Sequence, residues 1–244
     1  MRCSGDIENV GRPIIMARNL IAGPTPNQEI HIVDKKIFEK KLRKLYQDGS
    51  ENLEIITDFD WTFTRYKNNG ARVCSTYQLL QNSVLTSKKS AYINTLYEFY
   101  HPIEIDQTIP AEIKEKHMQD WWEKCNHTLL EEGFNNSDTI NFINNSSLYF
   151  RFGLPEFLII LKNQNIPITI LSGGIGNLIE TSLKQIHPEN GIKIVSNFIE
   201  FDKLGKSSQF IQPEVRADKS KLLTGKKFRK NILLLGDLVS VFDN

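Results

Sequence analysis

The sequence lacks an excess of charge of either sign, a long apolar run and any evident internal repeat. Its 244 residues carry 30 lysines and arginines against 29 aspartates and glutamates, which leaves a formal net charge of +1. Such a chain has no broad basic surface with which to hold a nucleic acid polymer or an acidic membrane. We expect neither as a partner, and any attraction for an anionic ligand must come from a local site.

Cysteine is also scarce. Cys3, Cys74 and Cys125 form no Cys-x-x-Cys pair and leave one residue over. This count argues against a disulfide framework and a zinc site, and it suits a reducing compartment. The charged N-terminal segment makes a poor signal peptide, and apolar runs such as residues 157–161 are far too short to span a bilayer. A cytoplasmic location is therefore expected.

The first half of the chain indicates a core strand followed by a helical insertion. Residues 34–46 follow helical spacing, and residues 53–57 form a short apolar run that is typical of a strand buried on both faces. Helical patterns then dominate, at residues 88–100, 111–134 and 137–146.

The second half alternates between strand and helix. The predicted helices and strands, in chain order, are 154–162, 166–171, 176–186, 192–195 and 231–235. Strands that alternate with helices predict a parallel sheet with helices on its faces. We therefore divide the chain into an N-terminal segment with the first part of an α/β core (1–71), a mostly helical cap (72–150) and the remainder of the core (151–244).

Polar residues follow three of the predicted core strands. The first strand leads into Asp58-Phe59-Asp60, the second into Ser172-Gly173-Gly174 and the last into Gly236-Asp237. Any one of these is ordinarily turn chemistry. Because ligands of such sheets bind beyond the carboxyl ends of the strands, the three together indicate a site.

Two aspartates beside a glycine-rich strand end suit phosphoryl transfer. One carboxylate can attack phosphorus to form an aspartyl phosphate, while the other protonates the leaving oxygen and later activates water. A magnesium ion would bridge carboxylate and phosphate. The glycines after Ser172, and the helix predicted to begin near Gly176, would bring backbone N–H groups to the phosphate.

The Asp-x-Asp-x-Thr pattern of residues 58–62, with Ser172 and the late Gly236-Asp237, resembles the haloacid dehalogenase superfamily. A closer similarity is to the cytosolic pyrimidine 5′-nucleotidases, the cytosolic 5′-nucleotidase III family. The similarity spans about residues 30–237, with matching order and spacing. Five stretches carry it: IITDFDWTFTRY (55–66), IEID (103–106), ILSGGIG (170–176), VSNFIEFD (195–202) and NILLLGD (231–237). The resemblance implies an α/β fold, with a Rossmann-like parallel-sheet core and a helical cap inserted after the first core strand.

The resemblance also implies roles for the residues of the core. Asp58 would be the nucleophile, and Asp60 would be the acid and base with its backbone carbonyl on Mg²⁺. Asp237 would complete the metal site, and Thr62 would brace the loop.

The phosphate would be contacted by Ser172 and Gly173. Relatives also use a lysine for the phosphate, for which we choose Lys219 and keep Lys221 as the alternative.

In the cap, Glu104 matches the glutamate that reaches the nucleoside, although a solvated loop acid is the plainer interpretation of such a residue. Trp121 and Trp122 lie in the segment that closes on the base, and helix packing is at least as good an explanation for one of them. Cys125 falls where relatives tend to carry serine, at a position that bears on base preference.

The last motif departs from the family pattern. Relatives carry serine after the final motif aspartate and a second aspartate four residues on, where this chain has Leu238 and Val241 and then ends at Asn244. We expect a C-terminally truncated core in which residues 231–235 form an apolar sheet edge. Such a form would be marginally stable, prone to association and much less active than a full-length relative.

The implied function is magnesium-dependent hydrolysis of nucleoside 5′-monophosphates, pyrimidine ones preferred, by a protein that is monomeric if it folds stably. Three alternatives stay open. The substrate is 7-methylguanosine monophosphate, or it is another small phosphate ester, or the chain is a catalytically impaired nucleotide-binding relative.

Overall fold

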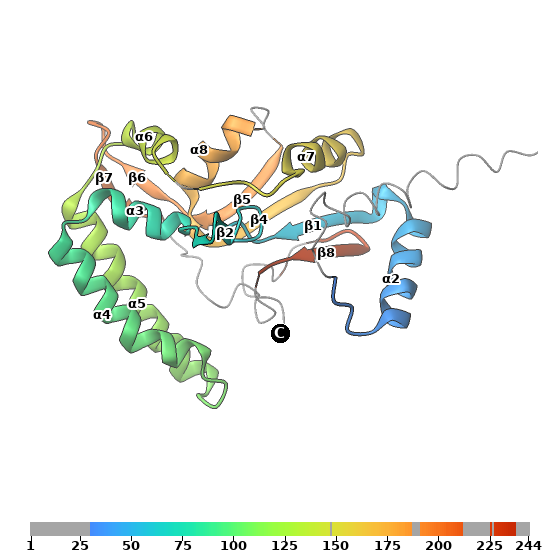
Figure 1. Cartoon of the computed structure of the whole chain (residues 1–244), viewed down its shortest axis with the longest axis horizontal. Coiled ribbons are helices and arrows are strands. Elements are labelled where there is room, and N and C mark those ends of the chain that lie inside the picture. The colour runs from blue at the N-terminus through green and yellow to red at the C-terminus, as the bar shows by residue number, and fades with distance from the viewer. Residues whose placement is uncertain (1–29, 147, 187–190, 212–224, 226, 238–244) are drawn as a thin grey trace, which may run out of the picture.

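The structure is a computed structural model that describes residues 30–146, 148–186, 191–211, 225 and 227–237. Its central sheet has four parallel strands in the order β5-β4-β1-β8 (Figure 1). The strands are β1 (Leu53–Thr57), β4 (Ile168–Ile175), β5 (Ile192–Asn197) and β8 (Asn231–Leu235). The predicted α/β fold with a parallel sheet is confirmed, and the strand that precedes the last motif lies beside the first strand.

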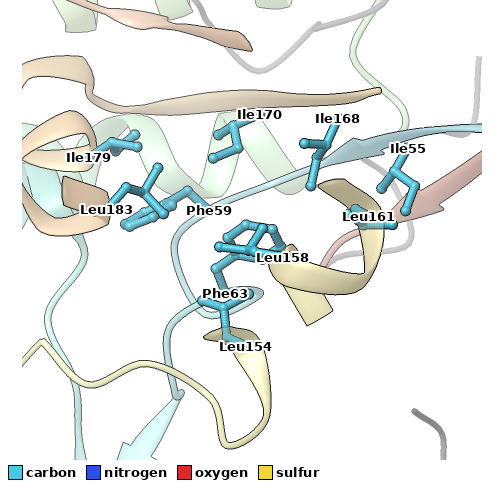
Figure 2. Close-up of a cluster of buried hydrophobic side chains, with 10 residues drawn as sticks. All are labelled: Ile55, Phe59, Phe63, Leu154, Leu158, Leu161, Ile168, Ile170, Ile179 and Leu183. Carbon is cyan, nitrogen blue, oxygen red and sulfur yellow. The ribbon is translucent and has the colours of Figure 1, made fainter. Parts of the chain in front are cut away.

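Two helices, α7 (Leu154–Asn163) and α8 (Gly176–Ile186), pack on one face of this sheet. Figure 2 shows the cluster that joins them to β1 and β4, made of Ile55, Phe59, Phe63, Leu154, Leu158, Leu161, Ile168, Ile170, Ile179 and Leu183. Burying each aliphatic side chain contributes about 1.5–3 kcal/mol. On the opposite face Ile56 and Leu171 are buried beside Val195 and Phe228, so β1 and β4 have apolar neighbours on both faces, as predicted for residues 53–57.

Strand β4 is longer than the sequence pattern predicts. The strand was expected to end at Leu171, but it continues to Ile175 after a register irregularity, and Ile175 pairs with Asn197. Two side chains of β5 explain the extension. The Ser196 hydroxyl donates to the Gly174 carbonyl at 2.8 Å, and the Asn197 amide donates to the Gly173 carbonyl at 2.9 Å.

Helix α2 (Lys35–Asp48) precedes the sheet and has no buried residue. It begins after Asp34, whose carboxylate accepts the Ile37 N–H at 2.9 Å, and the short helix η1 (Ser50–Asn52) connects it to β1. At its other end Asp48 accepts hydrogen bonds from Lys230 at 2.7 Å and from Asn231 at 2.9 Å. The helix is therefore tied to the start of β8.

Strand β8 has β1 as its only partner strand within the part of the chain that the structure describes. Three of its apolar side chains, Ile232, Leu233 and Leu234, are 37–43% exposed. Among the described residues β8 therefore lies at an edge of the sheet, as predicted.

The segment between β1 and α7 is largely helical. Its helices are α3 (Thr76–Val84), α4 (Ser87–Ile105), α5 (Ala111–Glu132) and α6 (Asp138–Asn144). Helix α3 was not predicted. The small hairpin of β2 (Lys67–Asn68) and β3 (Ala71–Arg72), which precedes it, was not predicted either.

Packing divides this segment into two parts. Helices α4 and α5 share their own apolar cluster and form a hairpin that projects from the core (Figure 1). Helices α3 and α6 and the end of α5 instead pack with α8 and with the hairpin of β6 (Ile199–Phe201) and β7 (Ser207–Phe210). In the described ranges, no helix is both long and apolar enough to cross a membrane.

Candidate active site

The loop after β1 presents the two predicted catalytic aspartates. The Asp58 N–H donates to the Leu235 carbonyl at 2.9 Å, so the β1–β8 ladder continues to the first of them. Phe59, between the aspartates, is fully buried in the core cluster (Figure 2). Its carbonyl accepts the N–H groups of residues 62–64 at 3.3, 2.9 and 3.2 Å, which closes a tight turn. Phe59 thus anchors the loop to the core.

Trp61 adopts a left-handed backbone conformation, with φ 59°, which is unusual for a bulky residue. Several bonds hold it there. Its backbone N–H donates to the Thr64 hydroxyl at 2.7 Å, and its indole N–H donates to the Val73 carbonyl at 2.8 Å. Arg151 donates to the Trp61 carbonyl at 2.7 Å, and the Arg72 guanidinium lies 4.4 Å from the centre of the indole ring. The loop is therefore fixed from several sides.

The hydroxyl of Thr62, expected to brace this loop, is buried and has no hydrogen-bond partner among the described residues. The hydroxyl that braces the loop belongs to Thr64, two residues further along.

Asp60 is held by the first residue of α3. The Thr76 backbone N–H donates to Asp60 Oδ1 at 2.8 Å, and the Thr76 hydroxyl donates to Asp60 Oδ2 at 2.9 Å. The same hydroxyl oxygen accepts the Ile175 N–H at 3.1 Å. One buried threonine therefore connects the second aspartate to the end of β4.

Gly174 lies close to both Thr76 and Asp60. A methyl group on Gly174 would lie 2.1 Å from the Thr76 hydroxyl oxygen, 2.7 Å from Asp60 Oδ2 and 3.3 Å from the Ser172 hydroxyl oxygen. The Ser172 hydroxyl accepts the Gly174 N–H at 3.2 Å and is itself buried. The structure thus brings Asp60 against the Ser172-Gly173-Gly174 segment.

Asp237 follows β8 at the same edge of the sheet. It lies two residues beyond Leu235, which pairs with Thr57, and is exposed. In the described residues, no three His, Cys, Asp or Glu side chains gather as a metal-binding group. The donors nevertheless suit magnesium, which prefers oxygen. Thr76 bonds both side-chain oxygens of Asp60, and this is compatible with the metal role that the family resemblance implies for the Asp60 backbone carbonyl beside Asp58 and Asp237.

Sequence reasoning missed Thr76 although a signal was present. Ser75 and Gln78 form a capping box, in which the Gln78 N–H donates to the Ser75 hydroxyl and the Ser75 N–H donates to the Gln78 side chain. Ser-x-x-Gln is a recognised helix-start pattern. It predicts where α3 begins, but not that α3 begins against Asp60.

The predicted nucleoside contact, Glu104, lies in the last turn of α4 and not in a loop. Its carboxylate oxygen is 3.1 Å from His101 Nδ1, and the His101 ring stacks on Tyr97 with centroids 4.7 Å apart. The tip of the hairpin, where α4 ends and α5 begins, stands apart from the carboxyl end of β1 (Figure 1).

The two cap tryptophans have different neighbours. Trp121 stacks on Tyr100, with ring centroids 5.8 Å apart and ring planes 15° apart. Trp122 meets Tyr77 edge to face at 5.1 Å. Both make packing contacts within the helical segment, as the plainer interpretation expected of at least one.

Cys125 is buried in the apolar cluster of the hairpin. Burial raises the pKa of its thiol to about 12. The structure therefore gives this residue a packing environment, and its effect on base preference stays a prediction. Lys219 and Lys221 lie outside the described residues, as do Leu238 and Val241.

A groove of about 750 Å³ on the α4–α5 hairpin contains none of the predicted site residues. Two of its lysines pair with acids of the same groove, Lys89 with Glu131 at 3.1 Å and Lys124 with Asp120 at 2.6 Å. We therefore place the candidate site at the carboxyl ends of β1, β4 and β8, called the sheet edge below, and not in this groove.

Comparison with known proteins identifies the family. The family model for pyrimidine 5′-nucleotidase (UMPH-1) matches residues 61–242. The 7-methylguanosine phosphate-specific 5′-nucleotidase A of Xenopus laevis is 30% identical over 220 residues, which cover 85% of this chain and 75% of that protein.

Solved structures agree with this assignment. The crystal structure of cytosolic 5′-nucleotidase IIIB bound to cytidine is similar with a TM-score of 0.68 and 27% identity, over 79% of this chain. The match spans 65% of that longer chain. A haloacid dehalogenase family hydrolase from Salmonella enterica, 13% identical, shares the fold over 94% of this chain and 80% of its own with a TM-score of 0.52. The chain has a fold of the haloacid dehalogenase type and belongs to the pyrimidine 5′-nucleotidase (UMPH-1) family.

Proposed function

We propose that this protein hydrolyses nucleoside 5′-monophosphates, pyrimidine ones preferred, to nucleoside and inorganic phosphate. The observation that carries the proposal is the position of Asp60, held by Thr76 against the Ser172-Gly173-Gly174 segment and two residues from Asp58. Membership of the pyrimidine 5′-nucleotidase family supports the substrate class.

Two aspartates suffice for the bond changes. A carboxylate oxygen of Asp58 attacks phosphorus, the bond from phosphorus to the 5′ oxygen breaks, and Asp60 gives its proton to that oxygen. Water then attacks the phosphorus of the aspartyl phosphate while Asp60 takes a proton from it. Phosphate leaves, Asp58 regains its carboxylate and Asp60 is again protonated.

The phosphate and its charge require further groups. Backbone N–H groups near Ser172 and Gly173 and the start of α8 would orient the phosphate oxygens, and Lys219 would add a positive charge. Asp58, Asp237 and the Asp60 carbonyl would hold magnesium, which would neutralise the phosphate and carboxylate charges.

Recognition of the nucleoside belongs to the α4–α5 hairpin. We propose that Glu104 bonds the nucleoside, that Trp121 contributes to the base site, and that Cys125 affects base preference from inside the hairpin. Because the tip stands apart from β1, Glu104 can reach a nucleotide at Asp58 only if the hairpin approaches the core. We also propose that the protein acts as a monomer in the cytoplasm.

A second substrate is favoured by one specific comparison. The Xenopus laevis relative is named as specific for 7-methylguanosine phosphate, so the same aspartates would then act on a methylated purine nucleotide.

The test is phosphate release from UMP, CMP, 7-methyl-GMP, AMP and sugar phosphates, each with magnesium and with a chelator. We expect magnesium-dependent release, fastest from UMP and CMP. Fastest release from 7-methyl-GMP would select the second substrate, and fastest release from a sugar phosphate would contradict both. No release from any substrate would favour the impaired nucleotide-binding alternative.

A further inference from the structure

We propose that Thr76 is the positioning residue for Asp60, the proposed general acid and base, and that its hydroxyl holds Asp60 Oδ2 against the Ser172-Gly173-Gly174 segment. The inference rests on the proposed function, and it concerns a residue outside the two-aspartate motif.

The geometry is that of a two-point clamp. Thr76 uses two donors of different kinds, a backbone N–H on Oδ1 at 2.8 Å and a hydroxyl on Oδ2 at 2.9 Å. Two bonds to the two oxygens fix both the position and the plane of the carboxylate. Thr76 is itself fully buried and begins a helix, so it cannot follow Asp60 freely.

The hydroxyl of Thr76 is itself held from two sides. It donates its hydrogen to Asp60 Oδ2 at 2.9 Å, and its oxygen accepts the Ile175 N–H at 3.1 Å. Oδ2 is therefore bonded by a hydroxyl whose own orientation is fixed.

The same oxygen faces the phosphate segment. A methyl group on Gly174 would lie 2.7 Å from Oδ2, so Oδ2 points at the backbone of the segment that would hold the phosphate. Because Ile175 bonds the same hydroxyl, β4 and α3 together set this orientation.

The test compares variants that differ in one hydroxyl. Thr76→Val and Thr76→Ala remove the hydroxyl and keep the backbone donor, whereas Thr76→Ser keeps both. Thr139→Val is the matched control, because Thr139 is another buried threonine near a helix start and its hydroxyl bonds only the Asn136 carbonyl in the described structure, at 2.7 Å. Each variant is measured for kcat and KM on the preferred nucleotide, for thermal unfolding, and for aspartyl phosphate trapped by rapid quenching during 4-nitrophenyl phosphate turnover.

We expect the two removal variants to lose about tenfold to a hundredfold in kcat with little change in KM, since a bond to a charged group is lost. With 4-nitrophenyl phosphate, whose leaving group needs no proton, the first step should proceed. The slower second step should then make aspartyl phosphate accumulate. Thr76→Ser should stay within about threefold of the parent in kcat, and Thr139→Val should match it.

Two results overturn the inference while leaving the proposed function intact. One is a removal variant that folds and turns over nucleotide within about twofold of the parent. The other is a serine variant that loses as much kcat as the alanine variant. A parent that hydrolyses 4-nitrophenyl phosphate but no nucleotide overturns the proposed substrate alone, and the Thr76 comparison still applies. A parent inert toward every ester overturns both.

Discussion

The reaction centre at the sheet edge and the α4–α5 hairpin hold their polar side chains in different ways. At the sheet edge, Asp60 is bonded by Thr76, 16 residues away, and Thr76 by Ile175, 99 residues away. On the hairpin, Glu104 lies beside His101 three residues away, and Lys124 beside Asp120 four residues away. The sheet edge is cross-linked between segments far apart in sequence, whereas the hairpin combines pairs within single helices with surface pairs between its own two helices, such as Lys89 with Glu131.

The difference has an energetic meaning. Pairs within one helix turn are partly exposed here, and such pairs contribute about 0.3–0.5 kcal/mol each. The part-buried bonds to the Asp60 carboxylate come from a segment far away in sequence, and they hold the group in place before substrate arrives. The sheet edge is therefore built to fix atoms, and the hairpin can move without losing its internal contacts. Substitutions at the sheet edge should therefore lower activity more than substitutions on the hairpin.

The largest effect is expected at Asp58, the proposed nucleophile. Asp58→Asn should lower turnover by several orders of magnitude while nucleotide binding persists, because the amide cannot form the aspartyl phosphate. Asp60→Asn should also abolish turnover. Steady-state phosphate release and equilibrium binding of UMP measure the two effects. An Asp58→Asn protein within about tenfold of the parent would remove Asp58 from the mechanism.

The next largest effect tests how tightly the sheet edge is packed. Gly174→Ala places a methyl group 2.1 Å from the buried Thr76 hydroxyl oxygen and should displace Asp60. We expect a loss of about 1–3 kcal/mol in the free energy of unfolding from overpacking, and a fall of about a hundredfold in turnover from misplacement of the acid. Gly191→Ala is the control, since no atom lies within 4 Å of a methyl group there. Equal behaviour of the two variants would contradict a rigid centre.

A smaller effect is expected on the hairpin. Glu104→Ala should lower kcat/KM for nucleotides about tenfold more than for 4-nitrophenyl phosphate, because a bond of about 1.5–3 kcal/mol to the nucleoside is lost. Comparing the two substrates in one preparation measures this selectivity. Equal losses on both would assign Glu104 to closure or folding of the hairpin.

The smallest effect concerns the hairpin interior. Burial raises the pKa of Cys125 from 9.0 to about 12. Above pH 9 the unfolded chain then loses a proton that the folded chain keeps, so this thiol lowers the free energy of unfolding as pH rises from 9 toward 12.

A labelling experiment tests the same burial. At pH 8 we expect iodoacetamide to modify the half-buried Cys74 well before Cys125, as peptide mass mapping would measure. Early labelling of Cys125 would mean that the hairpin opens readily.

The parts of the fold that sequence predicted are those with local causes. The apolar run of β1, the start of α8 at Gly176 and the strand Asn231–Leu235 agree with the structure residue by residue. The extension of β4 through Gly173 and Gly174 was not predictable, because it depends on side chains of a strand that follows about twenty residues later. The same holds for the site. A motif indicated Asp58 and Asp60, whereas the bond from Thr76 exists only after α3 has packed.

The conformation of Trp61 has an optical consequence. It is one of three tryptophans in the chain, and the other two lie together on α5. Its indole is hydrogen-bonded at Nε1 and covered by the Arg72 guanidinium, one residue from Asp60. In a protein in which Trp121 and Trp122 are replaced by phenylalanine, the remaining emission would report the polarity and charge around the aspartate loop alone. Binding at the sheet edge could then be followed as a change in emission, separately from movement of the hairpin.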